Sequence, residues 1–356
     1  MYIELPLDYV LGLAVWIACG VATAVLLLKL RRRWKRTAPG RVKWLNAGLS
    51  VWMFLAALTP VELYFAVVYD QSDSFNMSLV SKHWFRRHVV PNDAGFRDAH
   101  PLTKHIPAGT QRVCFVGDSF TFGHGIKDVA DRFSDRVGAR LDTERPGRFL
   151  VNNIGEAGIN AMQVTNFVRL LVDRGFHTDV VVYVICLNDI EGNSTADDEF
   201  YERLAVQGPR FFLFRHSYFL NMLYFRIQQA RLPQVRNYYS ELAAAYEGEP
   251  WNGMRHKLEE LRDFCAVRGI DLRIAIFPFL HNLGPDYPFD AGHEKIAELC
   301  RRESIPCLDL KPALLPHVAE GLTVNRFDAH PNERAHALVA EALEKDLLAD
   351  LFARQP

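Results

Sequence analysis

The hydropathy pattern begins with two long apolar runs that a strongly basic stretch separates. Residues 9–28 carry no charge and are long enough to cross the hydrocarbon core of a membrane as one helix. A second apolar run starts at Trp44 and continues, with one acidic interruption, to Tyr69. Because the sequence RRRWKR would not join two buried helices of a soluble domain, residues 1–70 are predicted to form a transmembrane helical hairpin with a basic loop at 29–43.

The charges around these runs set the expected orientation. The stretch from Lys29 to Lys43 holds eight basic residues and no acid, and the positive-inside rule places such a loop in the cytoplasm. Everything after Asp70 then faces outward, which in a bacterium means an inner-membrane protein whose main domain is periplasmic or otherwise extracytoplasmic. Glu62 is expected in the interface near the outer end of the second helix. Pro60 is expected to kink or shorten that helix.

Beyond residue 110, short β-rich runs alternate with amphipathic stretches. Five runs with few polar interruptions are predicted strands, at 112–117, 148–155, 179–186, 271–278 and 305–310. Helical periodicity is found at Met162–Arg174, Trp251–Arg268, Gly292–Arg302 and Pro331–Phe352. Apolar strands separated by helices are typical of a parallel sheet covered on both faces. We therefore expect a doubly wound, flavodoxin-like α/β fold with a mostly parallel five-stranded sheet.

Two further segments complete the predicted organisation. Residues 71–110 lack a clear period and contain turn signals, so they are expected to connect the hairpin to an α/β domain at 111–356. Within that domain, residues 190–250 form an insertion between the third and fourth strands. Its stretch 210–231 is aromatic, basic and apolar on most faces. It is either a helix packed on the domain, which is the favoured interpretation, or a helix that lies on the bilayer or covers the site.

Net charge and cysteine spacing exclude several kinds of partner. The formal net charge is −1, and residues 1–70 contribute +4 to it, so the remainder is mildly acidic. Nucleic-acid binding requires a basic face and is not expected. The six cysteines form no CxxC and no Cys/His cluster, so neither a metal nor another cofactor is expected. Cys300 and Cys307 are close enough to pair in an oxidising compartment, although close cysteines often stay unpaired.

Polar residues gather where the predicted strands end, which is the edge at which doubly wound sheets bind ligands. GDS follows the first strand, NIGEAG the second and LND the third, while FDAHPN precedes the last helix. Acyl transfer needs a nucleophile, a base, an acid that orients the base, and donors for the oxyanion. Ser119 can supply the hydroxyl, His330 the base and Asp328 the acid. The backbone N–H groups of Ser119 and Gly158, with the Asn188 amide, can form an oxyanion hole.

These four segments resemble the four blocks of the SGNH, or GDSL-type, hydrolase superfamily. In that family GDS carries the nucleophile, a glycine and an asparagine complete the oxyanion hole, and a late D-x-x-H carries the acid and base. The resemblance runs from about residue 111 to 345 and leaves 190–250 unmatched. It implies a membrane-anchored cell-envelope member of the family that acts on ester bonds through a serine nucleophile.

Two positions depart from the family pattern. Cys186 occupies a position where the third block usually has glycine, and Phe327 one where the usual aspartate would be. Envelope acyl-transfer members of the family resemble the D-x-H-P-N form found here. Asp328 is therefore the predicted acid, and Asp309 at the end of the fifth strand is the alternative.

Other polar residues receive lesser roles. Asp118 is expected to make structural hydrogen bonds rather than to act as a base. The segment NDAGFRD at 92–98 resembles a stretch found ahead of GDSF in some envelope members, and its Arg97 is a candidate substrate contact. Four histidines have no partner at a suitable spacing and are not expected to be catalytic: His124, His216, His281 and His293.

Three functions remain open at this point. The first is a membrane-anchored serine esterase that removes acyl groups, acetyl foremost, from an envelope glycan or lipid. The second is an O-acyltransferase in which a sugar hydroxyl accepts the acyl group from Ser119, beside a multi-span membrane acyltransferase. The third is a non-catalytic scaffold that binds glycan or a partner subunit, although the complete set of site residues argues against it. The choice between water and sugar depends on water exclusion, which the sequence does not reveal.

Overall fold

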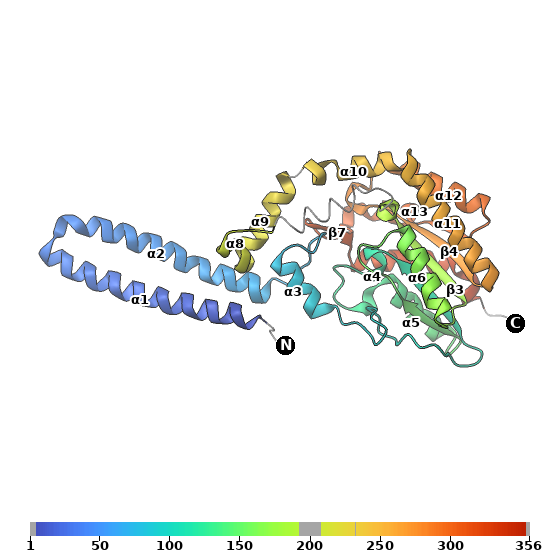
Figure 1. Cartoon of the computed structure of the whole chain (residues 1–356), viewed down its shortest axis with the longest axis horizontal. Coiled ribbons are helices and arrows are strands. Elements are labelled where there is room, and N and C mark those ends of the chain that lie inside the picture. Colours follow the sequence, from blue (N-terminus) through green and yellow to red (C-terminus); the bar gives the residue numbers. More distant parts are fainter. Residues whose placement is uncertain (1–4, 192–207, 232, 354–356) are drawn as a thin grey trace. The chain divides into compact units, whose positions relative to one another are not determined.

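The computed structural model describes residues 5–191, 208–231 and 233–353 (Figure 1). Their contacts divide the chain into two compact units. The first, here called the hairpin unit, contains the residues up to Gln71 together with Met77–His83 and Gly208–Gln229. The second, the sheet unit, contains the other described residues, among them Ser72–Asn76.

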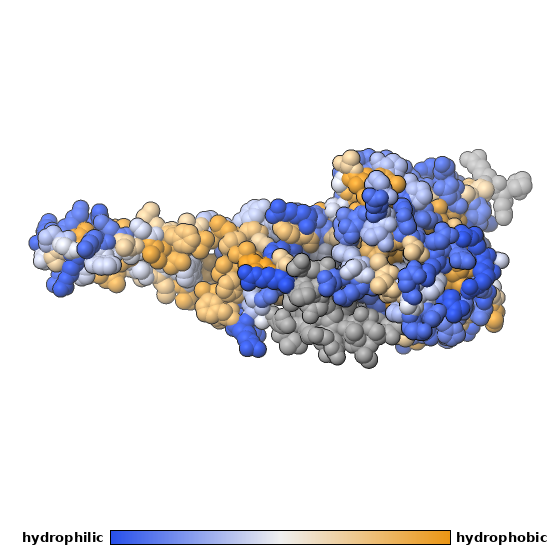
Figure 2. All heavy atoms as spheres, turned by 90° about the horizontal axis from the view of Figure 1, so that it is seen from above, coloured by the Kyte–Doolittle hydropathy of each residue, from blue (hydrophilic) through white to orange (hydrophobic). Residues whose placement is uncertain are grey.

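Two long helices form most of the hairpin unit. Helix α1 spans Leu7–Thr37 and α2 spans Val42–Leu63, and both are long and apolar enough to cross a membrane. Figure 2 shows apolar side chains along this hairpin and hydrophilic ones at its turn. The expected basic loop is mostly helix, since only a short 3₁₀ turn at Pro39–Arg41 separates the helices. Lysine and arginine are good helix formers, so α1 continues until the Pro-Gly break.

The second helix also continues further than expected. Pro60 lies inside α2, so the expected shortening is wrong, and a π-helical turn at Tyr64–Val68 (η2) follows Leu63 directly. A short helix, α3, spans Leu79–His88. In the insertion, α8 spans Phe212–His216 and α9 spans Tyr218–Arg231, while residues 192–207 lie outside the described part of the chain. The part of this segment up to Gln229 belongs to the hairpin unit, so the expectation that it packs on the sheet domain is wrong.

The sheet unit confirms the predicted α/β fold. Its five strands are all parallel and lie in the order β2-β1-β3-β4-β5, which is the flavodoxin-like order. They are β1 Gln111–Gly117, β2 Phe149–Asn153, β3 Val180–Cys186, β4 Asp271–Phe277 and β5 Cys307–Asp309. Each observed strand lies inside its predicted run or extends at most one residue beyond it. Every residue of β3 is buried, as expected for a central strand covered on both faces.

Helices cover the sheet in two groups (Figure 1). The helix α6, Ala161–Asp173, packs beside α11, Glu249–Arg268, and α5, Phe133–Glu144, packs beside α14, Glu333–Ala342. The helix α12, Asp290–Arg302, packs on β4 and β5. The remaining helices of the sheet unit are α4 Ser119–Phe122, α10 Pro233–Ala245, α13 Lys311–Leu314 and α15 Ala349–Phe352. All six cysteines are free, including Cys300 and Cys307.

The C-terminal region differs from the single helix predicted at Pro331–Phe352. Pro331 ends a short strand, β7, at Asp328–Pro331, which pairs antiparallel with β6 at Thr323–Asn325. The helix starts only at Glu333, and Asn332 caps it by accepting from Ala335 N. Pro331 is paired within the small sheet, and Asn332 has the extended backbone of an N-cap residue. The helix therefore cannot begin before Glu333. The small β6–β7 sheet places the candidate base and acid.

Candidate active site

The candidate nucleophile follows a tight strand-to-helix turn. A Cβ atom at Gly117, the last residue of β1, would lie 2.5 Å from the Val184 carbonyl oxygen of β3. A Cβ atom at Gly155, just after β2, would lie 2.6 Å from the backbone nitrogen of Phe122. Only glycine fits either position, so the backbone around Ser119 approaches both neighbouring strands closely. This packing places Ser119 at the carboxyl end of β1.

Asp118 organises this turn, as expected. Its carboxylate accepts from the backbone N–H of Phe120 at 2.9 Å, which caps α4, and from Asn188 Nδ2 at 3.2 Å. Ser119 Oγ lies 3.3 Å from the same side chain. Burial raises the pKa of Asp118 although these hydrogen bonds oppose the rise. The carboxylate therefore links the ends of β1 and β3 and is not placed as a proton acceptor for substrate.

Ser119, His330 and Asp328 form one line of hydrogen bonds. His330 Nε2 lies 2.8 Å from Ser119 Oγ, and His330 Nδ1 lies 2.6 Å from Asp328 Oδ1. The backbone N–H of His330 also donates to Asp328 Oδ1, at 3.1 Å. The one-residue spacing between acid and base is therefore sufficient, because β7 turns both side chains to the same side. This geometry is that of a nucleophile, a base and an acid that orients the base.

The other oxygen of the Asp328 carboxylate is also occupied. Ser72 Oγ donates to Asp328 Oδ2, and His124 Nε2 lies 3.6 Å from it. Burial alone would raise the pKa of Asp328, but the charge interactions with His330 and His124 and the hydrogen bonds from His330 and Ser72 hold that pKa below its ordinary value. Asp328 is fully buried and ionised at neutral pH, which is the state that can hold an imidazolium.

His124 is a site residue that the sequence did not reveal. Its ring stacks on the ring of His330, with centroids 4.0 Å apart and planes 3° apart. His124 Nε2 lies 3.0 Å from the Asp73 carbonyl oxygen, which can only accept, so this nitrogen carries the proton. Burial, with the charge of His330, lowers the pKa of His124 to about 3. The ring is therefore neutral, and the expectation that His124 has no partner is wrong.

The segment Ser72–Asn76 is part of the sheet unit and is fastened to β7. Ser74 Oγ accepts from the backbone N–H of Ala329 at 3.0 Å, and Asn325 Nδ2 donates to the Ser72 carbonyl oxygen at 3.4 Å. The Ser72 and Asp73 contacts described above complete the attachment. Residues 71–110 are therefore more than a connector at this point, because their first residues surround the candidate acid.

Arg97 supports the loop after the nucleophile rather than a substrate. Its guanidinium is buried and donates to the carbonyl oxygens of Gly123, at 2.7 Å, and of Ile126. The neighbouring Asp98 accepts from Asn152 Nδ2 at 2.8 Å. The segment 92–98 thus ties the loop that carries His124 to β2, and the expectation of a substrate contact at Arg97 is wrong.

The expected oxyanion donors differ in how firmly they are held. Asn188 lies in the 3₁₀ turn Leu187–Ile190 that follows β3, and its bond to Asp118 fixes the amide beside the nucleophile turn. Gly158 lies on the exposed turn after β2 with a φ of +82°, which favours glycine. Ser119 N belongs to the first turn of α4, whose N–H groups point outward from the helix end.

The model of the GDSL-like lipase/acylhydrolase family matches residues 115–338, more than half of the chain. The chain belongs to this family. As a member it is a serine hydrolase that acts on ester bonds. No curated protein sequence matched it.

Solved structures resemble this GDSL-like hydrolase at low sequence identity. TesA is 15% identical, with a TM-score of 0.43, and the match covers 68% of this chain and 99% of that one. A two-domain esterase active on acetylated mannans is 15% identical, with a TM-score of 0.40 and coverage of 70% and 52%. An acetyl xylan esterase from Geobacillus stearothermophilus is 13% identical, with a TM-score of 0.40 and coverage of 69% and 97%.

Asp309, the alternative acid, has a different partner in this GDSL-like hydrolase. It accepts from His293 Nδ1 at 2.8 Å and from the backbone N–H of Lys311 at 2.9 Å. His293 therefore has a partner, contrary to expectation, but the pair joins α12 to the end of β5 and does not include His330. Asp309 is not placed to orient the candidate base.

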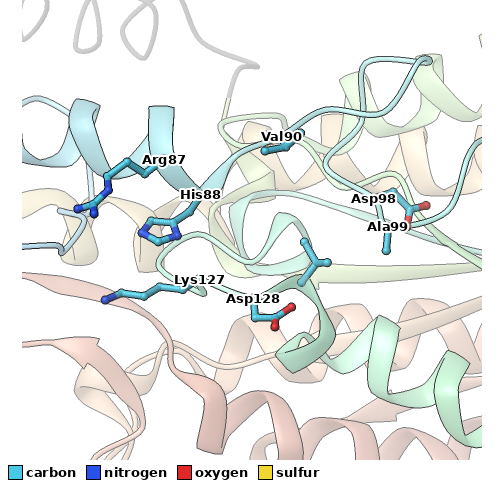
Figure 3. A pocket seen from close by; sticks show the side chains of 8 residues that line it. Arg87, His88, Val90, Asp98, Ala99, Lys127 and Asp128 are labelled. Atoms are coloured by element: carbon cyan, nitrogen blue, oxygen red, sulfur yellow. The ribbon is translucent and has the colours of Figure 1, made fainter. Parts of the chain in front are cut away.

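A cavity of about 480 Å³ lies elsewhere in the sheet unit (Figure 3). Its lining combines basic and acidic side chains, and none of them belongs to the hydrogen-bonded line at Ser119: Arg87, His88, Val90, Asp98, Ala99, Lys127, Asp128 and Val129. The cavity touches the loop that Arg97 holds, but nothing links it to the ester chemistry.

His124, Asp328 and His330 also lie close enough together to hold a metal ion. His124 Nε2 carries a proton that points at a carbonyl oxygen, and the two Asp328 oxygens already accept from His330 and Ser72. The donor set is therefore used for hydrogen bonding within the site. The arrangement fits proton transfer better than metal binding.

Proposed function

We propose that this GDSL-like hydrolase is a membrane-anchored, extracytoplasmic serine esterase that removes acyl groups from a cell-envelope glycan or lipid. The observation that carries the catalytic part is the line of hydrogen bonds from Ser119 through His330 to Asp328, at 2.8 and 2.6 Å. Membership of the family supports the ester bond. The two apolar helices and the basic residues at their turn support the anchoring and the outward orientation.

The geometry supports a double-displacement reaction. His330 Nε2 would take the proton of Ser119 Oγ while that oxygen attacks the ester carbonyl carbon. The carbonyl oxygen becomes an oxyanion, towards which the Asn188 amide and the backbone N–H groups of Ser119 and Gly158 would donate. As the tetrahedral intermediate collapses, the C–O bond to the alcohol breaks and the alkoxide takes the proton from His330. Asp328 would stabilise the imidazolium between these steps.

The second half of the reaction regenerates the serine. Water would give a proton to His330 and attack the acyl carbon, and the released Ser119 oxygen would take that proton back as the carboxylic acid leaves. Ser119 and His330 are only 9% and 7% exposed, so the acyl-enzyme would form in a largely enclosed place, and we propose acetyl as its acyl group. A sugar hydroxyl in place of water would make the same acyl-enzyme a transferase.

The proposal is tested with the full chain purified in detergent. We expect hydrolysis of p-nitrophenyl acetate, a fall of at least 10³-fold in Ser119→Ala, and an acetyl adduct on Ser119 in mass spectrometry of the quenched enzyme. Ser240→Ala, which removes an exposed serine hydroxyl from α10, is the matched control. Absence of both hydrolysis and adduct would refute the proposal. Transfer of acetyl to an added oligosaccharide, with little free acetate, would replace it by the O-acyltransferase.

A further inference from the structure

The first turn of α9 is tied to the end of α2 by one carboxylate. Glu62 Oε2 accepts from Ser217 Oγ at 2.5 Å and from Phe219 N at 3.1 Å. Glu62 Oε1 accepts from Tyr218 N at 2.8 Å and from Tyr9 Oη at 2.9 Å. A carboxylate at this place satisfies N–H groups that a helix start leaves unpaired, and it complements the helix dipole. The start of α9 is therefore held beside the last turn of α2.

Aromatic packing reinforces this attachment. The rings of Tyr9 and Tyr218 meet edge to face with centroids 5.0 Å apart, and those of Phe65 and Phe219 lie 5.3 Å apart. Tyr218 is 2% exposed and forms a small buried cluster with Ala66 and Val80. One side of the first turn of α9 is thus buried within the hairpin unit.

The residues just before this attachment are apolar and uncovered. Phe211, Phe212 and Leu213 at the start of α8 are 61%, 68% and 46% exposed. Arg210 and Arg215 flank them and are exposed as well, and α8 and α9 contain no acidic residue. Two adjacent exposed phenylalanines among arginines are unfavourable in water, and this composition is typical of helices at a lipid interface.

The nearest part of the hairpin is also uncovered. In η2, directly after α2, Tyr64 is 48% exposed and Val68 is 63% exposed. Figure 1 shows α8 beside the same end of the hairpin to which Glu62 fixes α9. Exposed apolar residues of α8 and of the last turn of the second candidate membrane span therefore lie at the same end of the hairpin.

We infer that Phe211, Phe212 and Leu213 insert into the outer-leaflet interface of the bilayer that the hairpin crosses, with Arg210 and Arg215 at the lipid phosphates. The inference rests on the membrane anchoring proposed above. It identifies the segment 210–216, which contains α8, as a membrane-surface element, and Glu62 as the residue that positions it.

A fluorescent probe on α8 tests this inference in the full chain. Phe212→Cys is made in a background of Cys19→Ala and Cys307→Ala, because these are the native cysteines that are not buried. The protein is labelled with an environment-sensitive dye and reconstituted in vesicles of phosphatidylethanolamine and phosphatidylglycerol. Val15→Cys, at a position 63% exposed in α1, reports on membrane insertion, and Val267→Cys, 84% exposed in the sheet unit, reports on water. Quenching is measured with a headgroup-proximal nitroxide lipid and with iodide.

The quenching results distinguish the interface inference from the membrane anchoring on which it rests. We expect the nitroxide lipid to quench the dye at 212 several-fold more than the dye at 267, and iodide to quench them in the reverse order. Lipid quenching at 15 but not at 212 would overturn the interface inference and leave the anchoring intact. Shielding at 212 from both quenchers would also overturn it, since a protein surface would then cover α8. No lipid quenching at 15 would remove the anchoring itself.

A second variant tests the role of Glu62. Glu62→Ala removes the acceptor of four hydrogen bonds, so α8 should lose its fixed position. We expect the lipid quenching at 212 to fall at least twofold while the quenching at 15 stays unchanged. Unchanged quenching at 212 would show that Glu62 does not position the segment.

Discussion

The hydroxyl of Ser72 donates a hydrogen bond to the carboxylate of Asp328, 256 positions further along the chain. Ser72 directly follows Gln71, where the hairpin unit's first segment ends. A residue only four positions after the second candidate membrane span therefore completes the surroundings of the proposed acid. Such a donor stabilises the ionised carboxylate and leaves its other oxygen aimed at the base.

Ser72→Ala should lower the turnover of the esterase without abolishing it. A hydrogen bond to a charged group contributes about 1.5–3 kcal/mol, so its loss from the oriented acid should lower kcat by roughly 10-fold to 100-fold if the effect falls on the transition state. The KM should change little, because Ser72 does not face the substrate. Steady-state kinetics on p-nitrophenyl acetate measures both constants.

The control for Ser72 separates catalysis from folding. Ser240→Ala removes an exposed serine hydroxyl that donates to the Asn237 carbonyl oxygen three residues earlier, and it should leave kcat unchanged. The near-UV circular dichroism of Ser72→Ala should match that of the parent. An unchanged kcat in a folded Ser72→Ala variant would contradict the proposed positioning role.

His124 should act through its flat, neutral ring. Its pKa of about 3 keeps it uncharged above pH 5, so it faces the His330 imidazolium of the transition state without repelling it. His124→Phe keeps a ring at this place and should retain most of the activity, whereas His124→Ala should lose roughly 3-fold to 30-fold, by analogy with ring–cation contacts of about 0.5–2 kcal/mol. The kcat–pH profile between pH 5 and 9 should keep its shape in His124→Phe. Equal losses in both variants would show that the bond to Asp73 matters instead.

The sequence predicted the sheet because its strands have a local signature. Val180–Cys186 is apolar throughout, and such a run in an α/β pattern has few alternatives to a buried parallel strand. The candidate nucleophile, base and acid could be named because each lies at a strand end or before a helix in a motif. The Gly117 turn and the Asn332 cap are local features of the same kind.

The parts that the sequence did not reveal depend on contacts between distant residues. His124 stacks on His330, and Ser72 meets Asp328, without any motif that joins the two members of either pair. Arg97 was a candidate substrate contact because the sequence does not show which groups surround its guanidinium. In the structure it donates to backbone carbonyl oxygens of the loop after the nucleophile. The contacts of residues 210–229 with the hairpin unit escaped the sequence for the same reason, since their attachment depends on Glu62.

Asn188→Ala should show the signature of a lost oxyanion donor. Removal of one such donor costs about 10²–10³ in kcat, with little change in KM, because the interaction forms only in the transition state. Asn237→Ala, at an exposed position of α10, is the matched amide control and should behave like the parent. The loss of the bond to Asp118 makes a stability check necessary, so the thermal midpoint is measured alongside. A folded Asn188→Ala enzyme with full activity would exclude the amide from the oxyanion hole.

The stability of the sheet unit should fall on acidification because histidines are buried in the neutral form. His336 is fully buried, accepts from the backbone N–H of Phe133 at 3.1 Å, and has a pKa lowered to about 3 by burial and nearby arginines. The unfolded chain, with a histidine pKa of about 6.5, binds this proton more readily, so the stabilisation is present above pH 6.5 and is lost as the pH falls towards 3. Each such group contributes a slope of up to about 1.4 kcal/mol per pH unit to the free energy of unfolding.

The variant His336→Asn, which keeps a hydrogen-bond acceptor, should flatten the dependence of the thermal midpoint on pH between 6.5 and 4. The control His177→Asn, at a site 58% exposed, should leave that dependence unchanged. Parallel curves for the parent and His336→Asn would contradict this assignment.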